Sequence, residues 1–189
     1  NDIDKLGRLY VDFLLEMDPG YGMLVGIHGR ALDRRYYDDR LGSVDSTSWI
    51  LRLAGNRARL DRLERMEADK LSEEDRADYL ILKNKIHLRN LEITELRAPT
   101  DPLTYISGRG NAFSGLGPAF SRLLMRDYAP LLQRLQSFGM RCRAVPRFLD
   151  EAKGMLGAKG ATPTAMQKQI ALGRLKGMTG ENGLFRKSL

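Results

Sequence analysis

The pattern of hydrophobic and polar positions is helical along most of the chain, and it is clearest in residues 71–98. Ser72 stands before this stretch as a candidate N-cap, and Pro99 stands where a helix must end. At about 100° per residue, its apolar side chains fall on two opposite sides of one helix. One side holds Tyr79, Leu82, Ile86 and Ile93, and the other holds Ala77, Leu80, Leu88 and Leu91. We therefore expect a central helix with packed neighbours on both sides.

The residues before this helix predict three more helices and one long loop. Apolar residues recur every three to four positions in residues 2–17, and Pro19 and Gly20 then favour a short second helix up to Gly26. Residues 26–45 are charged and have no sustained period, which predicts a loop. Asp45 and Ser46 mark the start of a helix over about 47–69. A short connection joins it to the central helix, so residues 47–97 should form an antiparallel hairpin.

The second half of the chain predicts a further group of helices. Residues 99–117 are rich in Gly and Pro and are expected to form an ordered connection, followed by a short helix over 118–126. A long helix over 127–156 should be capped by Asp127 and kinked at Pro146, and a last helix should span 162–178. The apolar stripe of the long helix over 127–156 is Leu131, Leu135, Phe138, Cys142, Val145, Leu149 and Leu156. The prediction is an all-α, multi-helix array of six or seven helices, with residues 1–189 forming a single helical region.

The charge of the chain is unevenly distributed. Residues 1–98 carry 17 Lys and Arg against 19 Asp and Glu, whereas residues 99–189 carry 14 against 5. This basic half fits an acidic protein or nucleic-acid partner, and it equally fits a fragment that packs against an acidic remainder. Helical spacing disfavours nucleic acid, because the second-half arginines scatter around their helices instead of forming one ridge. These arginines are Arg122, Arg126, Arg134, Arg141, Arg143 and Arg147.

The two histidines do not form a recognisable metal motif. His87 has no second His four residues later and no adjacent Glu, which a helical zinc site would need, so we expect a partly buried polar residue there. His28 lies in a loop flanked by glycines. It would polarise a substrate if that loop lined a cleft, but a hydrogen bond to the backbone is the favoured interpretation.

The other candidate groups also have structural explanations. Gly110 and Gly115 have phosphate-loop spacing but lack the Lys and the Ser or Thr that bind phosphate and metal. The pair Asp38 and Asp39 is expected to be solvated in the loop. Cys142 is the only cysteine, which excludes an internal disulfide, and we expect it to be a small buried residue. No catalytic group and no cofactor site is therefore assigned in this chain.

Four segments, in order, resemble the N-terminal half of the bacterial domain-of-unknown-function family 885. They are MDPGYGMLVGIHGRALDRRYYDDRL, LSEEDRADYLILKNKIHLRNLEITEL, DPLTYISG, and RDYAPLLQRLQSFGMRCRAVPRFLDEAKGML with the following helix. Members of that family resemble helical zinc metallopeptidases whose HExxH metal motif lies in the C-terminal half. The resemblance therefore implies zinc in a full-length parent and no catalytic residue in this chain. It also implies a wall or lid of a substrate channel, with Tyr105 and Arg109 facing the cleft. A packed Tyr105 and a surface Arg109 is the favoured alternative.

The leading functional hypothesis is a non-catalytic, N-terminal helical scaffold or lid of a metallopeptidase-like hydrolase. The alternative is a stand-alone basic helical module that binds an acidic protein or nucleic acid. The first hypothesis predicts that a missing C-terminal portion, or a second copy of the chain, covers an exposed apolar surface around Ile170, Leu172 and Leu175. No run of residues is apolar and long enough to span a bilayer. The bacterial cytoplasm and the cell envelope remain equally open as the location.

Overall fold

The computed structural model describes residues 2–108, 113–158, 163–180 and 183. Within these residues the protein is all-α, as predicted, and contains eight α-helices and two short 3-10 helices. The additional helix is α5, which lies inside the predicted connection after the central helix. The elements are α1 (Asp2–Met17), α2 (Pro19–Val25), α3 (Ser46–Glu64), η1 (Ala68–Lys70), α4 (Glu73–Thr94), η2 (Ala98–Thr100), α5 (Pro102–Ser107), α6 (Leu116–Met125), α7 (Leu131–Leu156) and α8 (Ala165–Thr179).

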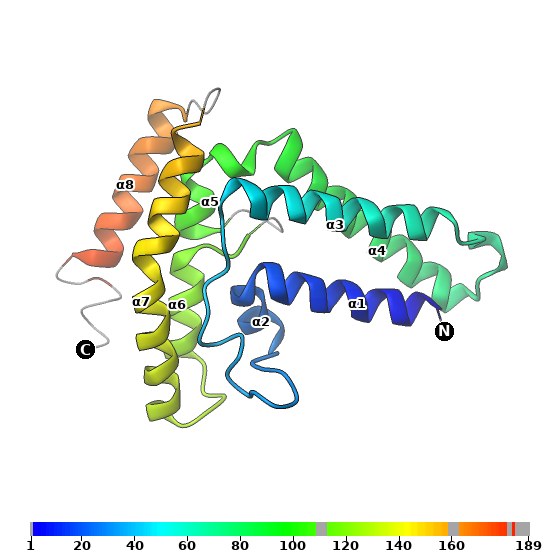
Figure 1. Ribbon diagram of the computed structural model, residues 1–189, viewed down its shortest axis with the longest axis horizontal. Coiled ribbons are helices and arrows are strands. Elements are labelled where there is room, and N and C mark those ends of the chain that lie inside the picture. The colour runs from blue at the N-terminus through cyan, green and yellow to red at the C-terminus, as the bar shows by residue number, and fades with distance from the viewer. Residues whose placement is uncertain (1, 109–112, 159–162, 181–182, 184–189) are drawn as a thin grey trace.

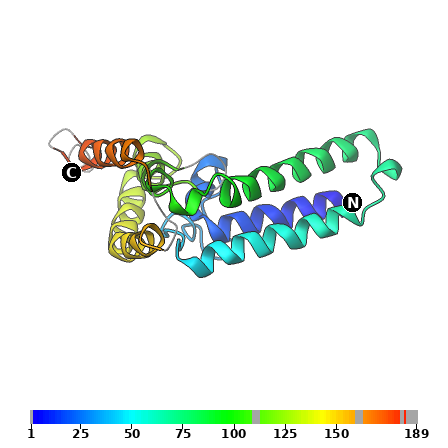
Figure 2. The same cartoon turned by 90° about the horizontal axis from the view of Figure 1, so that it is seen from above.

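The helices form an arm and an upright group (Figure 1). Helices α1, α3 and α4 lie side by side along the arm, with α3 and α4 joined as the expected hairpin (Figure 2). Helices α6, α7 and α8 stand across the inner end of the arm. The loop of residues 26–45 runs from α2 along the upright group to α3, so it connects the two parts of the molecule.

Several helix ends follow directly from the sequence. The carboxylate of Asp45 accepts a hydrogen bond from the Ser48 amide at the start of α3, and the Ser72 hydroxyl accepts one from the Asp75 amide at the start of α4. Such N-caps satisfy amides that have no partner within the helix. The predicted Asp127 cap of α7 is wrong, because the helix begins at Leu131 and Pro130 occupies its N-cap position.

Two hydrophobic clusters hold these parts together. The arm cluster joins α1, α3 and α4 through Ile3, Leu6, Tyr10, Leu14, Leu60, Leu63, Tyr79 and Ile86. The larger cluster lies where the arm meets the upright group, and its aromatic centre includes Trp49, Tyr105, Phe113 and Phe148. The Phe113 and Phe148 rings stack with centroids 5.8 Å apart. Aromatic packing from four segments therefore fixes the junction between arm and upright group.

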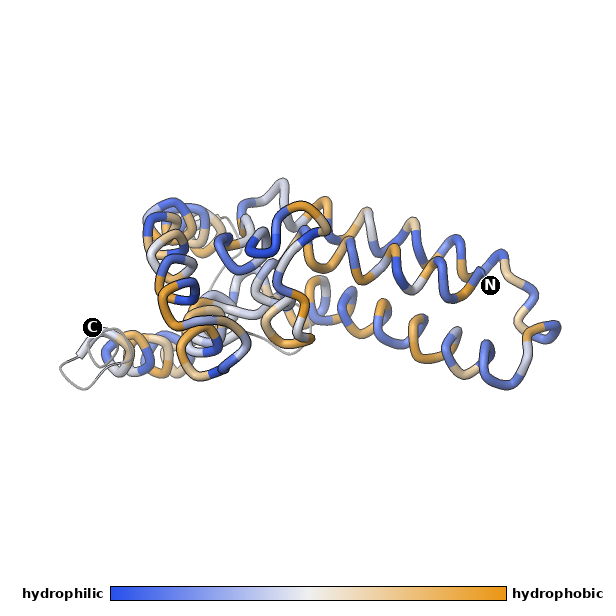
Figure 3. The backbone as a smooth tube through the Cα atoms, turned by 90° about the horizontal axis from the view of Figure 1, so that it is seen from below, coloured by the Kyte–Doolittle hydropathy of each residue, from blue (hydrophilic) through white to orange (hydrophobic). Residues whose placement is uncertain are grey.

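The central helix α4 is packed on one side only, which corrects the expectation of neighbours on both. Its first side holds the buried Tyr79, Ile86 and Ile93. On the second side, the exposed fractions are 49% for Leu80, 41% for Leu88 and 45% for Leu91. Polar and apolar residues alternate along the arm helices (Figure 3), and the other two arm helices lie beside α4 (Figure 2). An apolar stripe of α4 is therefore left without a described neighbour.

The buried side of α7 also differs from the prediction. In the first half of this helix the buried residues include Arg134, Ser137 and Arg141, whereas the expected core residues Leu131 and Leu135 are 57% and 38% exposed. The two arginines bind backbone carbonyls, as described below, and the Ser137 hydroxyl donates to the carboxylate of Asp39, which is half-buried in the loop. The helix continues through Pro146 without interruption. The predicted kink at Pro146 stays a prediction.

No helix within the described residues combines the length and the apolar character needed to cross a membrane.

Candidate functional site

A polar cluster forms where the loop of residues 26–45 meets the upright group. We call it the His28 cluster, and it consists of His28, Asp38, Tyr128 and Arg141. The Nδ1 atom of His28 lies 3.0 Å from a carboxylate oxygen of Asp38, and the imidazole stacks on the Tyr128 ring with centroids 3.8 Å apart and planes 3° apart. The Tyr128 phenol lies close enough to Asp38 for each group to influence the pKa of the other. One buried carboxyl therefore binds the His28 ring and lies near the Tyr128 phenol.

The loop folds so that Asp38 reaches His28. The backbone carbonyl of His28 accepts hydrogen bonds from the Tyr37 amide at 3.0 Å and from the Asp38 amide at 3.3 Å, which bring the two ends of the charged stretch together. The His28 ring binds the Asp38 carboxylate, which differs from the hydrogen bond to the backbone favoured from the sequence. Asp38 is 1% exposed, so the expectation of a solvated Asp38 is wrong.

The electrostatics of the His28 cluster follow from burial. Burial raises the pKa of the Asp38 carboxyl above its usual value, although the hydrogen bond from His28 and the charge of Arg141 act in the opposite direction. Burial, together with the charge of Asp38, also raises the pKa of the Tyr128 phenol. Arg141 is fully buried, and burial lowers its pKa to about 10. The positive charge of Arg141 thus favours the ionised form of the Asp38 carboxyl, whereas burial disfavours it.

The chemistry of the His28 cluster is limited to orienting an imidazole. A carboxylate on Nδ1 fixes the tautomer and the direction of the ring, as it does beside many functional histidines. The side chain of His28 is 24% exposed. Among the described residues, no Ser, Thr or Cys side chain hydrogen-bonds to His28, so the described part of the chain does not pair this base with a nucleophile.

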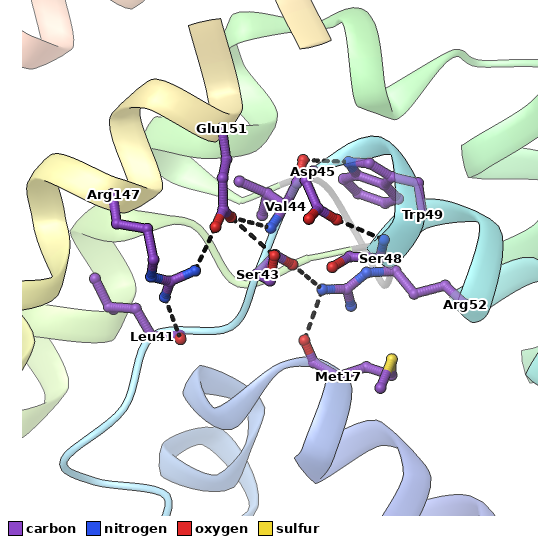
Figure 4. Close-up of polar contacts among 10 residues, drawn as sticks. All are labelled: Met17, Leu41, Ser43, Val44, Asp45, Ser48, Trp49, Arg52, Arg147 and Glu151. Atoms are coloured by element: carbon purple, nitrogen blue, oxygen red, sulfur yellow. Dashed lines mark hydrogen bonds and ion pairs between the residues drawn. The ribbon is translucent and has the colours of Figure 1, made fainter. Parts of the chain in front are cut away.

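A second polar junction ties the same loop to α7 and α3 (Figure 4). The Glu151 carboxylate accepts hydrogen bonds from the Ser43 hydroxyl at 2.9 Å and the Val44 amide at 2.8 Å. Arg147 binds Glu151 at 2.5 Å and donates to the Leu41 carbonyl at 3.2 Å. The Arg147 and Glu151 side chains of α7 therefore both bind the loop backbone, which gives this junction a structural role.

Arg52 completes the junction from the side of α3 (Figure 4). Its guanidinium donates to the Met17 carbonyl at 2.6 Å and to the Ser43 carbonyl at 2.9 Å. The side chain is buried, and burial lowers its pKa to about 10. A buried cation here satisfies carbonyls at the end of α1 and in the loop, so it joins three segments that are distant in sequence.

The predicted cleft residues have different outcomes. Tyr105 is 3% exposed and packs edge to face against Phe148, with ring centroids 6.2 Å apart. Its hydroxyl donates to the Pro99 carbonyl. Tyr105 is therefore a packed residue of the core, which was the favoured alternative from the sequence. Arg109 lies outside the described residues, and its place at a cleft stays a prediction.

The remaining candidates are dispersed. His87 is exposed rather than partly buried, and Cys142 is exposed rather than buried, although its surroundings raise the pKa of the thiol. Gly108 and Gly115 have φ values of 78° and 71° and approach each other so closely that a Cβ on Gly115 would lie 2.1 Å from the Gly108 nitrogen. These two glycines serve a close backbone crossing, and Gly110 lies outside the described residues.

The described residues do not fit a zinc site. No three His, Cys, Asp or Glu side chains in this part of the chain gather closely enough to hold a metal ion. A catalytic zinc site needs at least three protein ligands.

Sequence reasoning missed the structural arginines and their partners. Arg52, Arg134 and Arg141 are all buried. Arg134 donates to the Ala129 and Leu124 carbonyls, both at 2.9 Å, and Arg141 donates to the Ala119 and Tyr37 carbonyls. A usable signal existed for Arg52, since it stands three residues after Trp49 on the inward side of its helix. No sequence signal identifies the carbonyls that these arginines bind.

The comparisons with known proteins give one result. The family model described as "Bacterial protein of unknown function (DUF885)" matches residues 19–188. Neither the comparison with curated proteins nor that with solved structures gives a match. Since the family model covers most of this helical chain, the protein belongs to the bacterial family of unknown function DUF885.

Proposed function

We propose that this chain is the helical scaffold of a larger, metallopeptidase-like hydrolase, in which it forms a wall or lid of the substrate channel. The catalytic metal ligands would come from polypeptide outside these residues. The observation that carries the proposal is the second apolar side of α4. Leu80, Leu88 and Leu91 on this side are 41–49% exposed, and they form a stripe of the kind that normally packs against another helix.

The last helix supports the same role. Helix α8 has 15 residues, and Ala171 is its one buried residue among those described. Ile170 and Leu172 are 40% and 58% exposed, as predicted from the sequence, whereas Leu175 is partly buried. A helix that buries so little of its surface contributes little to the stability of this chain. Further polypeptide on its outer side would give it the missing apolar contacts.

The burial of arginines weighs against the alternative of a basic binding module. Two of the six arginines compared above, Arg134 and Arg141, lie inside the protein and bind backbone carbonyls. Arg147 is committed to Glu151 and Leu41. Phosphate binding needs exposed cations that are free to contact the ligand. These three arginines of the basic second half therefore have structural partners.

The first experiment is to measure the intact mass and zinc content of the natural gene product from its source, and to assay it with peptide substrates. A species much heavier than this chain that holds zinc and cleaves peptides would support the scaffold role. A natural product of this same size, without metal or hydrolytic activity, would refute it. The basic binding module would then become the leading hypothesis.

A second experiment tests the α4 stripe itself. Leu88→Lys and Leu91→Lys should leave the melting temperature of the 189-residue chain nearly unchanged, because both side chains are exposed there. In the full-length natural protein, each should destabilise by about 1–3 kcal/mol if further polypeptide covers the stripe. The matched control is His87→Lys, at an exposed position beside the stripe. Equal and small effects of all three changes in the full-length protein would contradict the proposal.

A further inference from the structure

A groove runs between α1 and α4 on the arm, and Tyr21 of α2 and Ile27 of the loop also line it. Its volume is about 660 Å³, which is within the range of small-molecule sites. Its walls are largely apolar and include Ile3, Leu14, Ile81 and Leu82. The charged side chains at its rim belong to Asp4, Arg8, Asp12, Asp78 and Lys85, and all of these residues are exposed. The rim therefore has mixed charge and does not by itself select a ligand.

One lining residue is both charged and buried. Arg89 is 7% exposed, and its guanidinium lies over the Tyr21 ring, 5.3 Å from the centroid. Among the described residues, none of the ion pairs within 4.0 Å includes Arg89. No described carboxylate therefore neutralises Arg89 at that distance. A second cation, Arg52, lies close enough to Arg89 that the Arg89 charge lowers the pKa of Arg52. A buried cation in this state is stabilised by an anion that enters the groove.

A buried hydroxyl stands beside this cation. Tyr10 is 4% exposed, lines the same groove, and its hydroxyl has no hydrogen-bond partner of good geometry among the described residues. Burial raises the pKa of this phenol to about 12, while the Arg89 charge acts in the opposite direction. The phenol therefore stays protonated near neutral pH and can donate a hydrogen bond. Most buried hydroxyls have an acceptor, so this one is unusual.

We propose that this groove binds a small amphipathic carboxylate, such as a medium-chain fatty acid. The carboxylate would accept charge-assisted hydrogen bonds from the guanidinium of Arg89 and a hydrogen bond from the hydroxyl of Tyr10. The alkyl chain would lie along the apolar walls formed by α1 and α4. This site does not depend on the scaffold role, because all of its lining residues belong to this chain.

The groove can be blocked without disturbing the packed core. Gly7 lines the groove, and a Cβ added to it would have no atom within 4 Å. Gly7→Leu therefore fills the groove and replaces a glycine within a helix by a better helix former. Gly154→Leu is the matched control, since Gly154 lies within α7, outside the groove, and a Cβ there would also meet open space.

The test is isothermal titration calorimetry of the full 189-residue chain with decanoate and with the neutral analogue decanamide. We expect saturable binding of decanoate and binding of decanamide that is weaker by about tenfold or more, because the charge-assisted bonds are lost. Gly7→Leu should abolish decanoate binding and keep or raise the melting temperature, whereas Gly154→Leu should bind normally. Arg89→Gln should weaken decanoate by about tenfold or more and remove the preference for it over decanamide. Tyr10→Phe should weaken decanoate by a few fold.

Several results would overturn the proposal. They are the absence of saturable decanoate binding to the unaltered chain, equal binding by Gly7→Leu and Gly154→Leu, and an unchanged preference for decanoate in folded Arg89→Gln. Circular dichroism will show whether Arg89→Gln is folded. If it is not, the pair of glycine variants decides the question, because neither substitution removes a contact.

Discussion

Replacing Glu151 should separate the loop of residues 26–45 from α7 and lower the free energy of unfolding. Glu151→Ala removes the acceptor for the Ser43 hydroxyl and for the Val44 amide, and Val44 is fully buried. A hydrogen bond to a charged group is worth about 1.5–3 kcal/mol, and a buried amide left without an acceptor adds to the loss. The Glu151 side chain is 17% exposed, so hydrogen bonds to water would offset part of this loss of free energy. The expected cost is therefore about 2 kcal/mol.

The neighbouring Asp150 is the matched control. Its ion pair with Lys153 joins two side chains that are each 75% exposed, so Asp150→Ala should change stability by less than about 0.5 kcal/mol. Urea unfolding followed by circular dichroism and by fluorescence will measure both variants. Trp49, the single tryptophan, donates to the Val44 carbonyl at 3.1 Å and so reports on this junction. With a slope of about 2 kcal/mol/M, Glu151→Ala should lower the midpoint by about 1 M. Equal midpoints for the two variants would refute the structural role of Glu151.

Three further predictions test packing, titration and thiol reactivity. Gly55→Ala should lower the free energy of unfolding by about 1–3 kcal/mol, because its Cβ would lie 2.3 Å from the Phe13 ring. The control Gly154→Ala should raise the free energy of unfolding, measured in urea, by about 0.5–1 kcal/mol. An equal effect of both changes would contradict the close approach of α1 and α3. Burial raises the pKa of Asp38 above 3.8, so the folded state holds that proton more tightly, and stability should fall as pH rises from 3.8 through the raised pKa. Asp38→Asn should lack this part of the pH dependence in urea midpoints measured across that range. Cys142 is exposed but has a raised pKa, so it should react with a disulfide reagent at pH 7 more slowly than free cysteine; faster reaction would show an activating environment.

Local sequence signals were sufficient for most helices. Helix α4 ends at Thr94, before Pro99 is reached, so the end predicted near residue 98 was too late. The caps at Asp45 and Ser72 act over three residues. Such signals depend on the geometry of one turn, so the sequence contains them completely. The start of α7 was misplaced because Asp127 is a good cap by composition, yet the chain turns helical only after Pro130.

The candidate sites depended on contacts across long separations and were mostly beyond prediction. His28 was identified as a loop histidine, but its stacking partner Tyr128 comes from the segment that joins α6 to α7. Arg89 stands three residues after Ile86, on the same side of α4, but only the packing of α1 and α4 made it a buried cation that lines a groove. The spacing of residues along one helix does not contain this information.

The sequence by itself determined that this protein is all-α, where most helices begin and end, and which side chains could turn inward. Helical periodicity and capping are local properties, and they operate before any two helices meet. Only the tertiary structure decided which apolar stripes are covered. Leu88 and Leu91 have a pattern as regular as that of Ile86 and Ile93, yet the first pair is exposed and the second is buried. Burial depends on the number and position of neighbouring helices, which the period of one helix does not specify.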